Sequence, residues 1–209
     1  MPELSTIFVF MAASLTLNLV PGPDMLYVIA RSVGQSRRAG LVSALGIGGG
    51  IVVHTLLLAC GLSALLISVP VAFEVVKYSG AAYLLYLGIK TLITKENLSL
   101  NKALPQEKLS RIFRQGVVTN VLNPKVALFF LAFLPQFTDP SKGSAFWQIL
   151  FLGMLFNTSS TILYCGVAWI AAGASSFLNS RPGFTRAQRW FTGSVFILLG
   201  VRIVLSERS

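Results

Sequence analysis

The sequence predicts an all-α integral membrane protein whose six transmembrane helices form a 3+3 inverted repeat. Three observations support this prediction. First, 54% of the 209 residues are hydrophobic and only 11% are charged, whereas about 25% are charged in ordinary soluble domains. Second, prolines interrupt two of the apolar runs, one in each half of the chain. Third, basic residues gather in alternate connections between the runs.

Six apolar runs reach the length of a membrane-spanning helix, about 20 residues. A soluble fold of this size could not bury them all, and the connections leave no room for a soluble domain. We therefore expect one transmembrane domain over 1–209, with a first repeat at about 1–94, a basic loop at about 95–112 and a second repeat at about 113–209. The six runs cover residues 5–31, 39–67, 71–93, 113–137, 145–174 and 187–205.

Lysine and arginine alternate between rich and poor connections along the chain. The first, third and fifth connections hold several each, whereas the second and fourth hold only Lys77 and Lys142. Because basic loops stay in the cytoplasm, both termini are predicted to lie outside. The net charge of +10 therefore does not indicate a nucleic-acid partner, which would need a soluble basic face.

The two halves of the chain resemble each other. Residues 77–90 and 189–202 align without a gap, each starting with a cation and an aromatic residue and ending in Leu-Gly-aliphatic-cation. The first and fourth runs both hold an asparagine, a proline break, a charge and an apolar half-helix. Three spans per half make the two copies cross the bilayer in opposite senses. Inverted repeats with paired broken helices are typical of secondary transporters, whose substrate site lies at the breaks.

The first break predicts a buried site. Pro21 and Pro23 each remove a backbone donor, and Gly22 is expected to allow unusual dihedral angles between them. Irregular backbone inside lipid survives only when protein packs on it or when it lines a wet cavity. Asp24 follows at the start of the next half-helix, whose N-terminus suits a carboxylate.

Asp24 and Lys125 are charges placed away from the ends of their spans. Such charges are costly and are normally paired or line a pathway, so we expect the two to face each other close to the binding cavity. In the alternative interpretation, Lys125 extends to the membrane interface and Asp24 only caps its half-helix. The candidate substrate-binding or coupling residues are Asn18, Pro21, Gly22, Pro23, Asp24, Asn120, Asn123, Pro124, Lys125 and Asn157.

Three further features lie within the apolar runs. His54 could relay protons, but we favour a neutral donor that bonds a neighbouring helix. The polar run 157–161 could line a path or mediate dry helix packing. The small-residue spacing from Gly46 to Gly50 predicts close approach of another helix, with lining of a cavity as the alternative.

The motif at 21–24, the glycines Gly34, Gly40 and Gly46, and the stretches 77–88 and 120–125 together resemble the LysE/RhtB family of amino-acid exporters. The resemblance covers essentially the whole chain. It implies a transporter of the bacterial inner membrane that exports amino acids or close derivatives, such as lysine, threonine, homoserine or leucine, by proton exchange. The family's functional positions correspond to Pro23, Asp24, Asn123, Pro124 and Lys125.

The predicted mechanism places a zwitterionic amino acid between the two buried charges. The substrate ammonium would meet Asp24, its carboxylate would meet Lys125, and protonation of Asp24 would release it. The scarcity of intramembrane acids favours neutral amino acids such as threonine, homoserine and leucine. Neither a cofactor nor a metal is expected. Six short-looped helices are compatible with a monomer or a homodimer.

Other classes of protein remain as alternatives. A divalent metal-ion exporter would need several carboxylates, thiolates or imidazoles to converge. A thiol–disulfide electron relay would need Cys60 and Cys165, in the second and fifth runs, to face each other in a polar setting. An enzyme is not expected, since no nucleophile and base are visible together.

Overall fold

The computed structural model describes residues 3–68 and 106–173, together with positions 78, 82, 85, 86, 89, 93, 194, 197 and 201. The described residues are helical and contain no strand. The predicted third and sixth helices, and with them the matching stretches 77–90 and 189–202, lie outside the described residues apart from these single positions.

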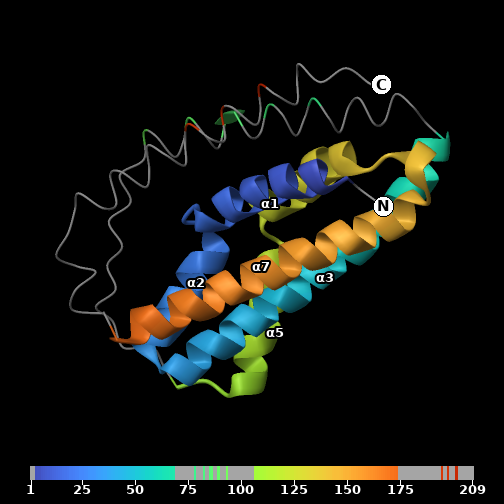
Figure 1. Cartoon of the computed structure of the whole chain (residues 1–209). Coiled ribbons are helices and arrows are strands. Elements are labelled where there is room, and N and C mark those ends of the chain that lie inside the picture. The colour runs from blue at the N-terminus through green and yellow to red at the C-terminus, as the bar shows by residue number, and fades with distance from the viewer. Residues whose placement is uncertain are drawn as a thin grey trace.

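The first predicted span is a bent pair of helices, α1 (Leu4–Leu19) and α2 (Pro23–Gly34), which meet at 54°. The link between them is extended at Val20 and Gly22. Pro23 begins α2 because its missing N–H is not needed in the first turn of a helix. Figure 1 shows the bend where the ribbon passes from α1 to α2.

The fourth predicted span is also bent, and it is irregular after the bend. Helix α5 (Leu109–Val121) is followed by α6 (Pro124–Leu128), a π-helical turn η1 (Phe129–Phe133) and a 3-10 turn η2 (Leu134–Phe137). The two parts meet at 49°. A last 3-10 turn, η3 (Pro140–Lys142), leads into the next long helix. Both breaks predicted from the prolines are therefore present.

Two long, unbroken helices pack antiparallel through small residues: α3 (Arg37–Ser68) and α7 (Ala145–Gly173). A side chain at Gly40 would meet Ala168, and one at Gly153 would meet Thr55. Figure 1 shows the two helices side by side along the molecule.

Helix α3 also approaches α5 closely. A side chain at Gly46 would clash with the backbone of Phe113, and Gly46 and Gly116 face each other. The close approach predicted from the spacing of Gly46 and Gly50 is confirmed.

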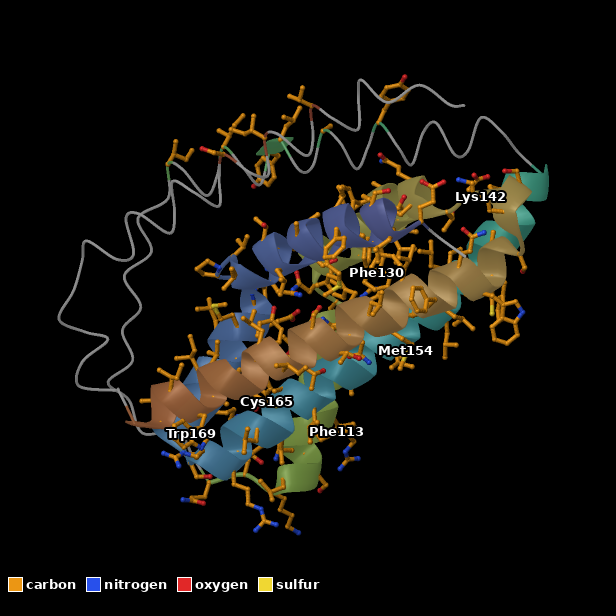
Figure 2. All side chains as sticks on the ribbon, viewed as in Figure 1. Phe113, Phe130, Lys142, Met154, Cys165 and Trp169 are labelled. Carbon is orange, nitrogen blue, oxygen red and sulfur yellow. The ribbon has the colours of Figure 1, made fainter. Side chains whose placement is uncertain are left out.

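The molecule has two chemically different ends. At the N-terminal end, Glu3 pairs with Lys142, which also lies near Asp139. At the other end, which carries the connection between α2 and α3 and is here called the loop-one end, Gln35 bonds the backbone of Glu107. Figure 2 places Lys142 at one end and Trp169 at the other. The described cations that gather at the loop-one end are Arg31, Arg37, Arg38, Lys108, Arg111 and Arg114.

The two bent pairs run in opposite directions between these ends. Helices α1 and α2 lead from the N-terminal end to the loop-one end, whereas α5 and α6 lead back. Within the described residues, α3 and α7 are long and apolar enough to cross a membrane, and each bent pair adds a further span if it is counted as one. These coincide with four of the six predicted spans.

Large apolar side chains lie on the outside of the bundle, as expected of a surface that contacts lipid. They include Leu4, Phe8, Leu57, Trp147, Ile162 and Ile170. The interior holds a core of aromatic and aliphatic residues together with the buried polar groups of both breaks.

Candidate functional site

The two helix breaks meet in the interior through Lys125. Its ammonium donates to the carbonyls of Leu17 (3.2 Å) and Val20 (3.0 Å) at the end of α1, where the Leu17 carbonyl also accepts from the backbone N–H of Val20. Lys125 is only 4% exposed. The interpretation that this side chain extends to the membrane interface is therefore wrong.

Gly22 has a different role from the predicted one. Its backbone is extended (φ −158°, ψ −179°), a conformation that any residue adopts. A side-chain carbon at this position would lie 3.0 Å from Lys125 Nζ. Glycine is therefore suited to this position by the close approach of the ammonium and not by unusual dihedral angles.

Asp24 is buried in the first turn of α2 and is 1% exposed. It accepts a hydrogen bond from Asn120 Nδ2 at 2.8 Å, which joins the two bent helices a second time. The N-cap of α2 is Gly22, so the interpretation of Asp24 as the cap is wrong. Lys125 lies within electrostatic reach of Asp24, but no direct ion pair between them is present in the described part of the chain.

Asn123 caps the second half-helix. It is the N-cap of α6, and its Oδ1 accepts from the backbone N–H of Lys125 at 3.0 Å. The cap fixes the turn that carries Lys125 toward the first break. Pro124 is the first residue of α6, as expected of proline at such a position.

The last turn of α1 contacts α7. Asn18 Nδ2 donates to Ser160 Oγ at 2.6 Å, and both side chains are buried. Asn157, the predicted residue of the polar run, is only half-buried; its Oδ1 accepts from Thr161 and lies against Gly48 of α3. No hydrogen bond in the described residues joins Asn157 to the breaks. Ser160 is the member of this run that the sequence analysis missed.

Several buried polar atoms at the breaks have no hydrogen-bond partner among the described residues. They are the acceptors Asp24 Oδ1 and Asn120 Oδ1 and the donor Asn123 Nδ2, which lies near the Asp24 carboxylate but makes no hydrogen bond of good geometry with it. The Lys125 ammonium has three donors and uses two on carbonyls. Because a buried polar group without a partner costs about 1–3 kcal/mol, these atoms favour a ligand with both donors and acceptors.

A polar network lies on the loop-one side of the site; we call it the loop-one network. The Tyr27 hydroxyl donates to the Ile112 carbonyl (2.9 Å) and lies 3.1 Å from Gln115 Oε1. Arg31 donates to the same Gln115 oxygen at 3.0 Å and to Gln35 at 3.3 Å. The network joins α2 to α5 and was not predicted from the sequence. A weak signal was present, since these polar residues fall within or directly beside apolar runs.

Packed phenylalanine rings, tilted or edge-on to one another, lie on the opposite side of the site; we call them the aromatic layer. Their centroids are 4.7 Å apart for Phe129 and Phe133, 5.2 Å for Phe129 and Phe156, and 5.4 Å for Phe10 and Phe137. Figure 2 shows Phe130, beside this layer, in the interior between α1 and α7.

The cysteine relay is contradicted by the packing of α3 on α7. Because Gly40 meets Ala168 and Gly153 meets Thr55, Cys165 lies opposite Ser43, whereas Cys60 lies 17 residues further along α3. At about 1.5 Å per residue this offset is about 25 Å. Both thiols are free.

Metal ligands do not converge in the part of the chain that the structure describes. No group of three or more His, Cys, Asp or Glu side chains that could hold a metal ion is found there.

The fold and the buried polar site define a multi-pass membrane protein with a site between broken helices. Residues 15–207 match the model of the LysE type translocator family, so the chain belongs to the LysE type translocator family. This membership indicates a transporter and not an enzyme.

Curated relatives match over nearly the full length of both chains. The homoserine/homoserine lactone efflux protein of Salmonella typhi is 29% identical over 202 residues, which is 97% of each chain. The leucine efflux protein of Salmonella choleraesuis is 28% identical over 204 residues, 93% of this chain and 92% of the relative. An uncharacterized membrane protein of Vibrio cholerae is 28% identical over 199 residues, 95% and 96% of the two chains. No solved structure matches this chain.

Proposed function

We propose that this protein exports neutral amino acids or close derivatives, of the threonine, homoserine or leucine type, from the bacterial cytoplasm across the inner membrane in exchange for protons. Membership of the translocator family and the names of the relatives support export of such solutes. The observation that carries the proposal is the set of unpartnered donors and acceptors at the breaks.

The arrangement matches the two charged groups of an amino acid. The substrate ammonium has three N–H donors, which Asp24 Oδ1 and Asn120 Oδ1 can accept. The carboxylate accepts from Asn123 Nδ2 and from the remaining N–H of Lys125. The groups common to all amino acids are thus bound by residues from both bent helices.

The positions of the described acidic residues favour a substrate with a neutral side chain. Among the described acids, Glu3, Glu107 and Asp139 lie near the two ends of the molecule, and Asp24 alone lies at the breaks. A second cation on the substrate would meet no further carboxylate of the described residues there. The nearby rings of the aromatic layer suit an apolar or small side chain instead.

Asp24 is also the proposed proton carrier. A proton from outside would bind the carboxylate, remove the charge that holds the ammonium and release the substrate. Return of the proton to the cytoplasm would restore the charge for the next substrate. One proton then enters for each amino acid that leaves.

The orientation in the membrane, the internal repeat and the oligomeric state belong to the same proposal. The cations at the loop-one end support a cytoplasmic position for that end and outside positions for both termini. The opposite directions of the two bent pairs support a 3+3 inverted repeat, with one domain over 1–209. The ten candidate residues given above remain the proposed site, and a homodimer remains a prediction.

The Asp24→Asn variant tests the coupling. In proteoliposomes it should insert normally but lose proton-coupled export, because an amide neither carries the charge nor takes up the proton. Asp139→Asn, which changes an exposed acid at the N-terminal end, is the matched control and should transport normally. Coupled export at the wild-type rate by Asp24→Asn would contradict the mechanism.

The substrate class requires a separate measurement. Cells that overproduce the protein should resist toxic analogues of neutral amino acids and retain less of the matching amino acid. Resistance to divalent metals without resistance to any analogue would favour the metal exporter.

A further inference from the structure

We propose that His54 is a positioning residue for Asp24 that acts through Asn120 as an N–H donor. This inference rests on the proposed function, in which Asp24 carries the proton. It answers what the only histidine of the chain does inside the membrane-spanning part.

Two hydrogen bonds join His54 to Asp24 in series. His54 Nε2 lies 3.2 Å from the carbonyl oxygen of Asn120, and Asn120 Nδ2 donates to Asp24 Oδ2 at 2.8 Å. Because a carbonyl oxygen only accepts, Nε2 must carry the hydrogen in the first bond. His54 on α3 thereby fixes Asn120 on α5, and Asn120 in turn holds the carboxylate of Asp24 on α2.

The position of Asn120 shows what the bond from His54 adds. It lies one residue before the end of α5, where backbone hydrogen bonding gives way to the break. Its carbonyl already accepts from the N–H of Asn123 at 2.9 Å. The bond from His54 ties this end of α5 to α3, a helix without a break.

Two neighbours complete the support. A side-chain carbon at Gly50, one turn before His54, would lie 2.6 Å from Asn120 Cβ and 2.7 Å from Asn120 Oδ1. Glycine therefore makes room for the Asn120 side chain. The imidazole packs against the Phe130 ring, with centroids 5.7 Å apart, which limits its rotation.

The two hydrogen bonds that join His54 to Asp24 cannot conduct a proton. A proton that left His54 toward Asp24 would have to cross a backbone carbonyl and a side-chain amide, and neither group takes up or releases protons near neutral pH. The charged or titratable groups within electrostatic reach of Asp24 are Lys125 on α6, Tyr164 on α7 and His54 itself, and among the described residues the hydrogen bonds that lead from His54 to Asp24 pass through Asn120. The contacts therefore assign His54 a role in geometry.

Three variants separate positioning from proton transfer. His54→Gln keeps an N–H donor at a similar reach but cannot carry a proton. His54→Leu removes the donor. Gly50→Ala leaves His54 intact and displaces Asn120. Thr55→Val is the matched control, since it removes a neighbouring buried donor that bonds only within α3.

The readouts are the export rate against pH in proteoliposomes and the infrared carboxyl band of the purified protein, identified as the band that Asp24→Asn removes. We expect His54→Gln and Thr55→Val to match the wild type in both. His54→Leu and Gly50→Ala should each lower kcat/KM about fivefold to tenfold, the effect of one lost hydrogen bond, and shift the titration of the band. In an Asn120→Ala background, His54→Leu should cause no further shift.

Different outcomes would overturn the proposal. Loss of coupling in His54→Gln would assign proton transfer to His54. A wild-type pH profile and band in His54→Leu would remove the positioning role, even if Gly50→Ala shifts both. The infrared titration needs no substrate, so it stays informative if the chain exports no amino acid and the proposed function itself fails.

Discussion

The loop-one network and the aromatic layer cover the two sides of one buried site with opposite chemistry. Tyr27, Arg31 and Gln115 join α2 to α5 through hydrogen bonds. On the other side, Phe129 of η1 packs its ring against that of Phe156 of α7. The contrast follows the direction of the chain, since the polar contacts lie toward the basic end and the rings toward the N-terminal end.

The difference indicates how each side can open. Water can replace the partners of an amide or a guanidinium, so a protein–protein hydrogen bond contributes only about 0.5–1.5 kcal/mol net. Water offers no equivalent partner to rings that have been pulled apart, and their exposure costs about 25 cal/mol per Å² of apolar surface. The loop-one side is therefore expected to open at lower cost than the side of the aromatic layer.

The largest expected loss of stability comes from a change in the aromatic layer. Phe129→Ala removes a ring that is 0% exposed and should lower the free energy of unfolding by about 3–5 kcal/mol. Phe8→Ala is the control, since Phe8 is 67% exposed on α1, and it should cost far less. Unfolding in detergent, followed by circular dichroism, measures both. Equal losses would show that the rings of the aromatic layer do not pack as described.

A smaller loss of stability is expected from a change in the loop-one network. Gln115→Leu takes the shared acceptor from Tyr27 and Arg31 and should lower the free energy of unfolding by about 1–3 kcal/mol, because the guanidinium keeps its burial and loses a partner. Export should also change, since the variant loosens the α2–α5 contact. A loss as large as that of Phe129→Ala would remove the contrast between the two sides.

Tyr27→Phe sharpens the comparison within the network. It keeps the ring and removes the hydroxyl that bonds Ile112 and Gln115, so we expect a loss of about 1 kcal/mol. Added to Gln115→Leu, it should cost less than it does alone, because the two variants break a common contact. Full additivity would mean that the hydroxyl acts only through Ile112.

The smallest effect on stability is expected at the N-terminal end, from the Glu3–Lys142 pair. Lys142 holds the pKa of Glu3 below its usual range through a hydrogen bond and its charge. The ionised pair therefore contributes stability above the usual glutamate range, and the contribution is lost as the pH falls through the lowered pKa. Because both side chains are about half exposed, Glu3→Gln should change the Tm at pH 7 less than Tyr27→Phe does.

Local rules predicted the breaks and their charges from the sequence. A proline ends a helix wherever it falls, and a charge within an apolar run is visible without a structure, so Pro23, Pro124, Asp24 and Lys125 were found. Gly22 was found for the wrong reason, because the residue that approaches it lies in the other half of the chain.

Partners across helices were not predictable in the same way. The long helices α3 and α7 are apolar on nearly every side, so no amphipathic pattern shows which face turns inward. The choice of Ser160 over Asn157, and the bond of His54 to Asn120, depend on the rotation of each helix. Only the packed helices fix that rotation.

The hold of Lys125 on the carbonyls of Leu17 and Val20 has a mechanical consequence. A side chain from the start of one half-helix fastens the end of another, so neither bend can flex without pulling its counterpart. The pair behaves as a single joint. A ligand that binds the remaining N–H of Lys125 therefore acts on both bends at once.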